Sequence, residues 1–214
     1  MDFISLKKLV QSGETDQVEF KRKVRHPEKI VRELVAFANT KGGELFIGVN
    51  DDLSIPGLQH PDEDDFLMQK SIRELCRPSL YFVSTIIPIS DSRGIVHITV
   101  PESESKPHYA LKTKNQRWGT AYVRVDDKSL QASRELCQIL KLTKRNHHHY
   151  FSYGEKEKQL MNYLGEHEFI TLNTFIEAAS IKRREASDIL VNLTLSNALK
   201  IIPKEGEDWF VHVD

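Results

Sequence analysis

The chain has 214 residues, and its 30 Lys and Arg side chains against 31 Asp and Glu give a net charge of −1. This balance excludes bulk electrostatic attraction to nucleic acid, so any such attraction must come from local basic patches. No run of about 18 apolar residues is present, which predicts no membrane span. The opening segment lacks the order of a signal peptide, and only Cys76 and Cys137 are present. These features indicate a cytoplasmic protein with reduced thiols.

The first part of the chain predicts alternating helices and strands. An amphipathic helix is expected over 4–14 and a strand over 17–24. Pro27 suits the first turn of a second helix, because its missing N–H costs nothing there. Gly42 and Gly43 are expected to end that helix, since a left-handed C-cap favours glycine.

The remainder of this domain combines further helices with hairpins, which predicts a mixed α+β fold over residues 1–145. Turn signals such as "SDSRG" and "KNQRWG" separate the expected strand pairs. The expected elements are a central strand over 44–49, a helix over 62–76, hairpins over 80–100 and 108–125, and a helix over 129–142 with Ser129 as its N-cap.

The last part of the chain has a different pattern. Residues 146–153 show no periodicity and are interpreted as a linker. Residues 154–214 predict three helices followed by a hairpin with "KEGED" at its tip. Three helices and a two-stranded ribbon are typical of a winged helix.

The glycine pair does not have the features of a phosphate-binding loop. The spacing of a P-loop, in which Gly is followed after four residues by Gly-Lys-Ser/Thr, is absent. Gly42 and Gly43 also follow a helix, whereas an anion site uses the free N–H groups where a helix begins. The sequence therefore argues against an ATPase.

A set of carboxylates brackets the strand-helix-strand unit. Glu14, Glu19 and Asp51 are candidate ligands for Mg²⁺ or Mn²⁺, with Asp52 as a replacement for Asp51, because these ions prefer oxygen ligands and promote phosphodiester cleavage. Lys21 shares the strand face of Glu19 and could contact a phosphate. In the alternative interpretation Glu19 pairs with Lys21, and Asp51 with Asp52 forms a turn. Both interpretations stay open at this point.

Basic residues provide the candidate nucleic-acid contacts. Residues 1–153 carry 23 Lys and Arg against 20 Asp and Glu, a net charge of +3, whereas 154–214 carry 7 against 11, a net charge of −4. This asymmetry favours the first domain for phosphate contacts, with solvated surface charge as the alternative. The candidates are the dense run Lys21, Arg22, Lys23 and Arg25, the segment with Lys112, Lys114, Arg117 and Trp118, and the domain's end with Lys141, Lys144 and Arg145.

The expected third helix of the winged helix begins with Lys182, Arg183 and Arg184, which could reach phosphates or base edges. The acidic wing tip has the wrong sign for a DNA backbone, so the alternative is a protein-interaction or dimerisation module. The run His147–His149 is not expected to bind zinc, because no Cys-x-x-Cys pair accompanies it.

The segments "VEFKRK", "AFANTKGGELFIGVNDD" and "IPG", followed by "SKPHYAL" and "AYVRVDDKSLQAS", resemble the Schlafen AlbA-type DNA-binding domain. The resemblance covers roughly Phe3 to Leu142. Many bacterial members are regarded as transcriptional regulators and often carry a C-terminal winged helix. The resemblance therefore implies a bacterial, cytoplasmic regulator that binds DNA or RNA and needs no cofactor for binding.

The resemblance also implies an alternative activity. Animal Schlafen proteins contain a metal-dependent RNA-cutting core, and Glu14, Glu19 and Asp51 resemble its three acidic residues in order and local sequence. In that alternative the protein is an endoribonuclease that uses Mg²⁺ or Mn²⁺. The Schlafen core has two lobes and a Cys/His zinc finger, whereas this chain has one lobe and no clear finger. A homodimer would rebuild the two-lobed cleft.

The sequence thus predicts a nucleic-acid-binding protein, with transcriptional regulation as the preferred role. The predicted contacts are Lys21, Arg22, Lys23 and Arg25 in the first domain and Lys182, Arg183 and Arg184 in the winged helix. The alternatives are the ribonuclease and an adaptor that binds protein through its winged helix.

Overall fold

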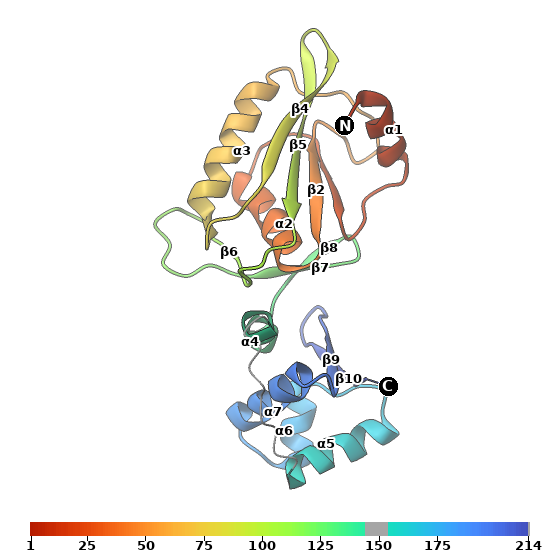
Figure 1. Ribbon diagram of the computed structural model, residues 1–214, viewed down its shortest axis with the longest axis vertical. Coiled ribbons are helices and arrows are strands. Elements are labelled where there is room, and N and C mark those ends of the chain that lie inside the picture. The colour runs from red at the N-terminus through yellow and green to blue at the C-terminus, as the bar shows by residue number, and fades with distance from the viewer. Residues whose placement is uncertain (144–153, 214) are drawn as a thin grey trace. The chain divides into compact units, whose positions relative to one another are not determined.

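The computed structural model describes residues 1–143 and 154–213 and divides the chain into two compact units, Met1–Gln131 and Ala132–Asp214 (Figure 1). The expected linker, 146–153, lies outside the described residues. The expected domain boundary at residue 145 differs from this division, because α4 (Arg134–Leu142) packs within the second unit. There the Ser187 hydroxyl donates a hydrogen bond of 2.5 Å to Glu135 on α4.

A four-stranded mixed sheet forms the centre of the first unit, in the order β1-β2-β5-β4. β1 runs parallel to β2, and the other neighbours are antiparallel. The mixed α+β class expected from the sequence is therefore confirmed. The strands are β1 (Val18–Lys21), β2 (Gly42–Ile47), β4 (Val83–Ser90) and β5 (Arg93–Pro101).

Helices cover both faces of this sheet. α2 (Pro27–Asn39) and α3 (Pro61–Leu75) lie on one face, where Leu34 and Phe37 pack among apolar side chains of β2 and β5. α1 (Phe3–Gln11) lies on the other face, where Leu6 packs in one cluster with Phe20 and Phe46. Burying each such side chain contributes about 1.5–3 kcal/mol, so packing on both faces of the sheet stabilises this unit.

Gly42 and Gly43 serve a different purpose from the expected C-cap. α2 ends at Asn39 with Thr40 as its C-cap, and the glycines begin β2. Gly42 has a φ of +79°, and a Cβ there would lie 2.7 Å from the Glu102 nitrogen. A Cβ on Gly43 would overlap the ring of Phe37. Close packing against β5 and α2 therefore requires these glycines.

The second expected hairpin is paired differently. β6 (Tyr109–Ala110) pairs with β3 (Cys76–Arg77), and β7 (Tyr122–Val125) pairs with β8 (Lys128–Gln131). The reason is a tight turn at Asp126, which adopts a φ of +53° and returns the chain at once. Residue 129 is consequently in a strand, and the N-cap of α4 is Ser133, whose hydroxyl accepts the Leu136 N–H at 3.0 Å.

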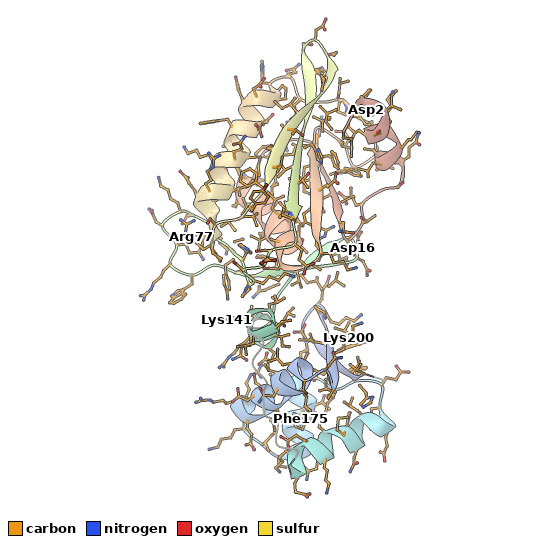
Figure 2. The ribbon with its side chains drawn as sticks, viewed as in Figure 1. Asp2, Asp16, Arg77, Lys141, Phe175 and Lys200 are labelled. Carbon is orange, nitrogen blue, oxygen red and sulfur yellow. The ribbon has the colours of Figure 1, made fainter. Side chains whose placement is uncertain are left out.

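The second unit contains the expected three helices and hairpin. Its core includes Phe175 (Figure 2), which is fully buried with Leu190 and Phe210. Ile170 adds an isolated antiparallel bridge to Phe210. The elements are α5 (Glu155–Glu166), α6 (Leu172–Ala179), α7 (Arg183–Leu195), β9 (Leu199–Ile202) and β10 (Trp209–His212).

Among the described residues, none of the helices is both long enough and apolar enough to cross a membrane.

We predict that Gly43→Ala lowers the free energy of unfolding by about 1–3 kcal/mol, because the added methyl group must displace the Phe37 ring. Urea unfolding followed by circular dichroism measures the change. Gly165→Ala is the control, because a Cβ there meets nothing within 4 Å, and helix propensity alone makes it neutral or slightly stabilising. Equal effects of the two substitutions would contradict the role given to Gly43.

Candidate nucleic-acid interface

Glu19 lies on β1 and is 4% exposed. Its Oε1 atom is ion-paired with Lys21, and its Oε2 atom accepts a hydrogen bond of 2.8 Å from Nη1 of Arg124 on β7. The pair of Glu19 and Lys21, which the sequence left open, is therefore present. Both oxygens of this buried carboxylate are thus engaged by cations, which leaves it little freedom to take another ligand.

Arg124 is the residue that the sequence analysis missed. Its side chain is fully buried, and it also contacts Glu33 on α2 at 3.1 Å and donates to the Thr15 carbonyl at 2.7 Å. Its guanidinium lies 5.0 Å from the centre of the Phe37 ring. The available signal was its motif "AYVRV", in which a charged residue follows a buried valine in a short strand.

Glu14 precedes β1 and has a backbone role. Its Oε1 atom accepts the Phe20 N–H at 2.8 Å, which satisfies a donor on the open edge of β1. Burial, together with the nearby charge of Glu19, raises the pKa of Glu14. It lines a pocket of about 570 Å³ with Asp16 (Figure 2), Asp126 and other side chains from the β7–β8 turn.

Asp51 lies apart from this arrangement. It is exposed in a turn after β2, in which the adjacent Asp52 accepts hydrogen bonds from the backbone and side chain of Ser54. Those hydrogen bonds and, to a smaller extent, the charge of Arg22 lower the pKa of Asp52. This is the turn chemistry of the second interpretation.

The expected ligand set does not fit a metal ion. Glu19 is ion-paired, Glu14 is bonded to the backbone of β1, and Asp51 is in an exposed turn. Over residues 1–143 and 154–213, no group of three or more His, Cys, Asp or Glu side chains is arranged to hold one.

The basic segment consists of Lys21, Arg22, Lys23 and Arg25 and begins at the last residue of β1. Most of it lies outside the buried ion pairs around Arg124. Lys21 is committed to Glu19, whereas Arg22, Lys23 and Arg25 are exposed. Arg22 and Lys23 line a pocket of about 480 Å³ together with Arg93, which donates to the Pro56 carbonyl at 2.9 Å. Glu63 and Asp64 on α3 line the same pocket, so its charge is mixed.

The three candidate cations of the second unit lie at the start of α7 and are all exposed. Arg183 donates to Asn173 at 3.1 Å, and Asn173 in turn donates to Glu207 at the wing tip. Arg184 lies 4.0 Å from Asp188, and Lys182 is the N-cap residue. Acidic side chains thus lie near the basic side chains at the start of this helix.

The Cys76 thiol is buried and that of Cys137 is half-buried. Burial raises the pKa of Cys76 to about 12 and that of Cys137 to about 11, so both thiols stay protonated at neutral pH. The candidates Lys144 and Arg145 and the run His147–His149 lie outside the described residues.

We predict that Arg124→Met lowers the free energy of unfolding by about 3–5 kcal/mol, because it leaves Glu19 and Glu33 without their buried partner. Chemical unfolding measures the effect. Arg117→Met is the matched control, since Arg117 is exposed and such substitutions change stability by about 0.5 kcal/mol or less. An Arg124→Met variant as stable as the wild type would show that the ion pairs of Arg124 with Glu19 and Glu33 do not stabilise the fold.

Comparison with known proteins identifies the family of this chain and several solved structures that resemble it distantly. The DIP2311 protein of Corynebacterium diphtheriae is 17% identical with a TM-score of 0.44, over 59% of this chain and 24% of that one. The N-terminal domain of a RecG-related protein from Nitrosomonas europaea is 20% identical with a TM-score of 0.44, over 71% of this chain and 99% of that one. This chain thus spans about a quarter of the DIP2311 chain. None of the curated proteins matches it.

The profile of the family described as "Schlafen, AlbA_2" matches residues 14–133, which is more than half of the chain. The match includes Glu14, Glu19, the basic segment and Arg124. This confirms the resemblance seen in the sequence. The chain belongs to the Schlafen AlbA_2 family.

Proposed function

We propose that this protein binds nucleic acid through the first unit, with Arg22, Lys23 and Arg25 as its main phosphate contacts. The observation that carries the proposal is that these three cations are exposed within five residues of the chain, while Lys21 beside them is held by Glu19. Exposed, clustered cations release counterions from nucleic acid on binding, and this is the main source of affinity without sequence preference. Membership in the Schlafen AlbA_2 family supports a nucleic-acid-related role.

The acidic groups beside the cations of α7 favour the same part of the chain. Net charge does not separate the two units, because residues 1–131 carry 19 Lys and Arg against 19 Asp and Glu, and residues 132–214 carry 11 against 12. In the second unit, the wing-tip Glu207 shares Asn173 with Arg183, so a phosphate approaching Arg183 would also meet a carboxylate. We therefore assign the larger electrostatic contribution to the first unit.

The finer role is that of a transcriptional regulator. The second unit has the element order of a winged helix, and Lys182, Arg183 and Arg184 at the start of α7 would then add contacts to a duplex. The acidic wing tip favours protein contacts, so an adaptor function of this unit is the second candidate. A homodimer, which would rebuild a two-lobed cleft from one lobe per chain, stays a prediction that light scattering would test.

We predict that the triple variant Arg22→Ala, Lys23→Ala, Arg25→Ala binds a 20-base-pair duplex more weakly than the wild type. The slope of log affinity against log salt becomes shallower by about 2 to 3, since each lost phosphate contact contributes about 0.9. Fluorescence anisotropy at four salt concentrations gives both quantities. A wild-type affinity that does not change with salt concentration would contradict the proposal.

Two further triple variants serve as controls. One tests whether the loss of any three exposed cations has the same effect, and the other compares the second unit with the first. Lys7→Ala, Lys8→Ala, Lys70→Ala removes three exposed cations from α1 and α3 and should leave the slope unchanged. Lys182→Ala, Arg183→Ala, Arg184→Ala removes the cations of α7 and should change the slope by less than the first variant does. A larger effect in α7 would move the interface to the second unit.

A further inference from the structure

A second basic surface lies between α2 and the loop that joins β6 to β7 (Figure 1). It contains a pocket of about 310 Å³, near the lower end of the range of about 300–1,000 Å³ in which small ligands are bound. Its floor is apolar and includes Leu111, while Lys29 and Arg32 come from α2 and Lys112 from the loop. Three cations thus face one pocket against a single carboxylate, Glu28, which has His26 at 3.4 Å.

Aromatic rings accompany these cations. Tyr122 lines the pocket, and the guanidinium of Arg32 lies 5.5 Å from the centre of its ring. Trp118 is in the loop and is 74% exposed, with the guanidinium of Arg117 at 5.2 Å from its ring. Exposed aromatic rings with cations beside them are the groups on which proteins stack unpaired bases.

The loop is shaped by its own hydrogen bonds. The Gln116 side chain accepts the Lys112 N–H at 2.8 Å and donates to the Trp118 carbonyl at 2.5 Å. At the end of the loop, Thr120 and Ala110 exchange two backbone hydrogen bonds of 2.8 and 2.9 Å. The backbone beside Trp118 is therefore tied to the backbone beside Lys112, which keeps the ring and this one cation of the pocket on a short segment.

We propose that this surface binds single-stranded nucleic acid, with an unpaired base stacked on Trp118 and the adjoining phosphates near Lys112, Arg32 and Lys29. Stacking on exposed aromatic rings with flanking cations is how proteins hold single strands without reading their sequence. A duplex cannot use such a ring, because its bases are already stacked on one another. The inference goes beyond phosphate binding by the basic segment, although it rests on the proposed function for the class of ligand.

The test measures affinities for a 12-nucleotide oligo(dT), a 12-nucleotide oligo(U) and a 12-base-pair DNA duplex. Trp118→Ala should weaken binding of at least one single strand by about tenfold or more and leave duplex affinity unchanged. Trp118→Phe should retain most of the single-strand affinity, because it keeps an aromatic face. The two oligonucleotides show whether the strand is DNA, RNA or either.

Phe66→Ala is the matched control, since Phe66 on α3 is 71% exposed, and its loss should change none of these affinities. Fluorescence gives an independent measurement, because Trp118 and Trp209 are the two tryptophans of the chain. In a Trp209→Phe background, oligonucleotide addition should quench the remaining emission of Trp118.

Single-strand affinities that are the same in Trp118→Ala and the wild type would overturn the inference and assign the ring to a protein partner. The variant without Arg22, Lys23 and Arg25 separates this failure from that of the proposed function. If the triple variant loses duplex affinity while Trp118→Ala keeps its single-strand affinity, the proposed function stands and the Trp118 site is wrong. If the triple variant keeps its duplex affinity while Trp118→Ala loses single-strand affinity, the Trp118 site stands and the proposed function is wrong. Binding of none of the three probes would overturn both.

Discussion

The guanidinium of Arg124 is fully buried, and a charge in that position is stable only when its partners surround it. Those partners come from separate parts of the first unit: Glu19 on β1, Glu33 on α2 and the Thr15 carbonyl before β1. One side chain on β7 therefore joins the edge strand of the sheet to the helix that covers it. Removing Arg124 would take this cation from both carboxylates at once, so the arrangement constrains all three elements together.

This constraint determines what the acidic residues of the family motif can do in this chain. Glu19 is occupied by two cations, and Glu14 satisfies a backbone donor on the edge of β1. A Glu19→Ala variant would therefore lose stability as well as any activity, and loss of activity in it would not identify a catalytic group. The cations that follow Lys21 have no such commitment to Glu19, which leaves them exposed for phosphates.

Local signals predicted much of the fold. Pro27 correctly indicated the first turn of α2, whereas the glycine pair that was expected to end this helix begins β2. The pairing of β7 with β8 was missed, because it depends on a left-handed Asp126 rather than on a glycine turn. Arg124 was missed for a related reason. Its importance arises from partners more than 90 residues away in the sequence, which periodicity cannot reveal.

The charges at the surface were the easiest to locate and the hardest to interpret from sequence. Arg22 and Arg183 both appear as exposed basic residues, and the structure gives each a different acidic neighbourhood: Arg22 shares a pocket with Glu63 and Asp64, whereas Arg183 shares Asn173 with an acidic wing residue. Lys112 and Trp118 appeared as one segment among several, and the folded chain places Lys112 in one pocket with Lys29 and Arg32 of α2. Side-chain neighbours, which only the folded chain defines, separate a candidate interface from ordinary solvated charge.

The central claim is that nucleic acid meets the exposed cations of the first unit and not the carboxylates around Arg124. Hydrogen–deuterium exchange of the full chain, with and without a saturating oligonucleotide, tests it most directly. The account predicts slower exchange in residues 22–29 and 112–120, with little change in residues 14–19. Slower exchange confined to residues 14–19 and 124–127, with the basic segment unaffected, would contradict it.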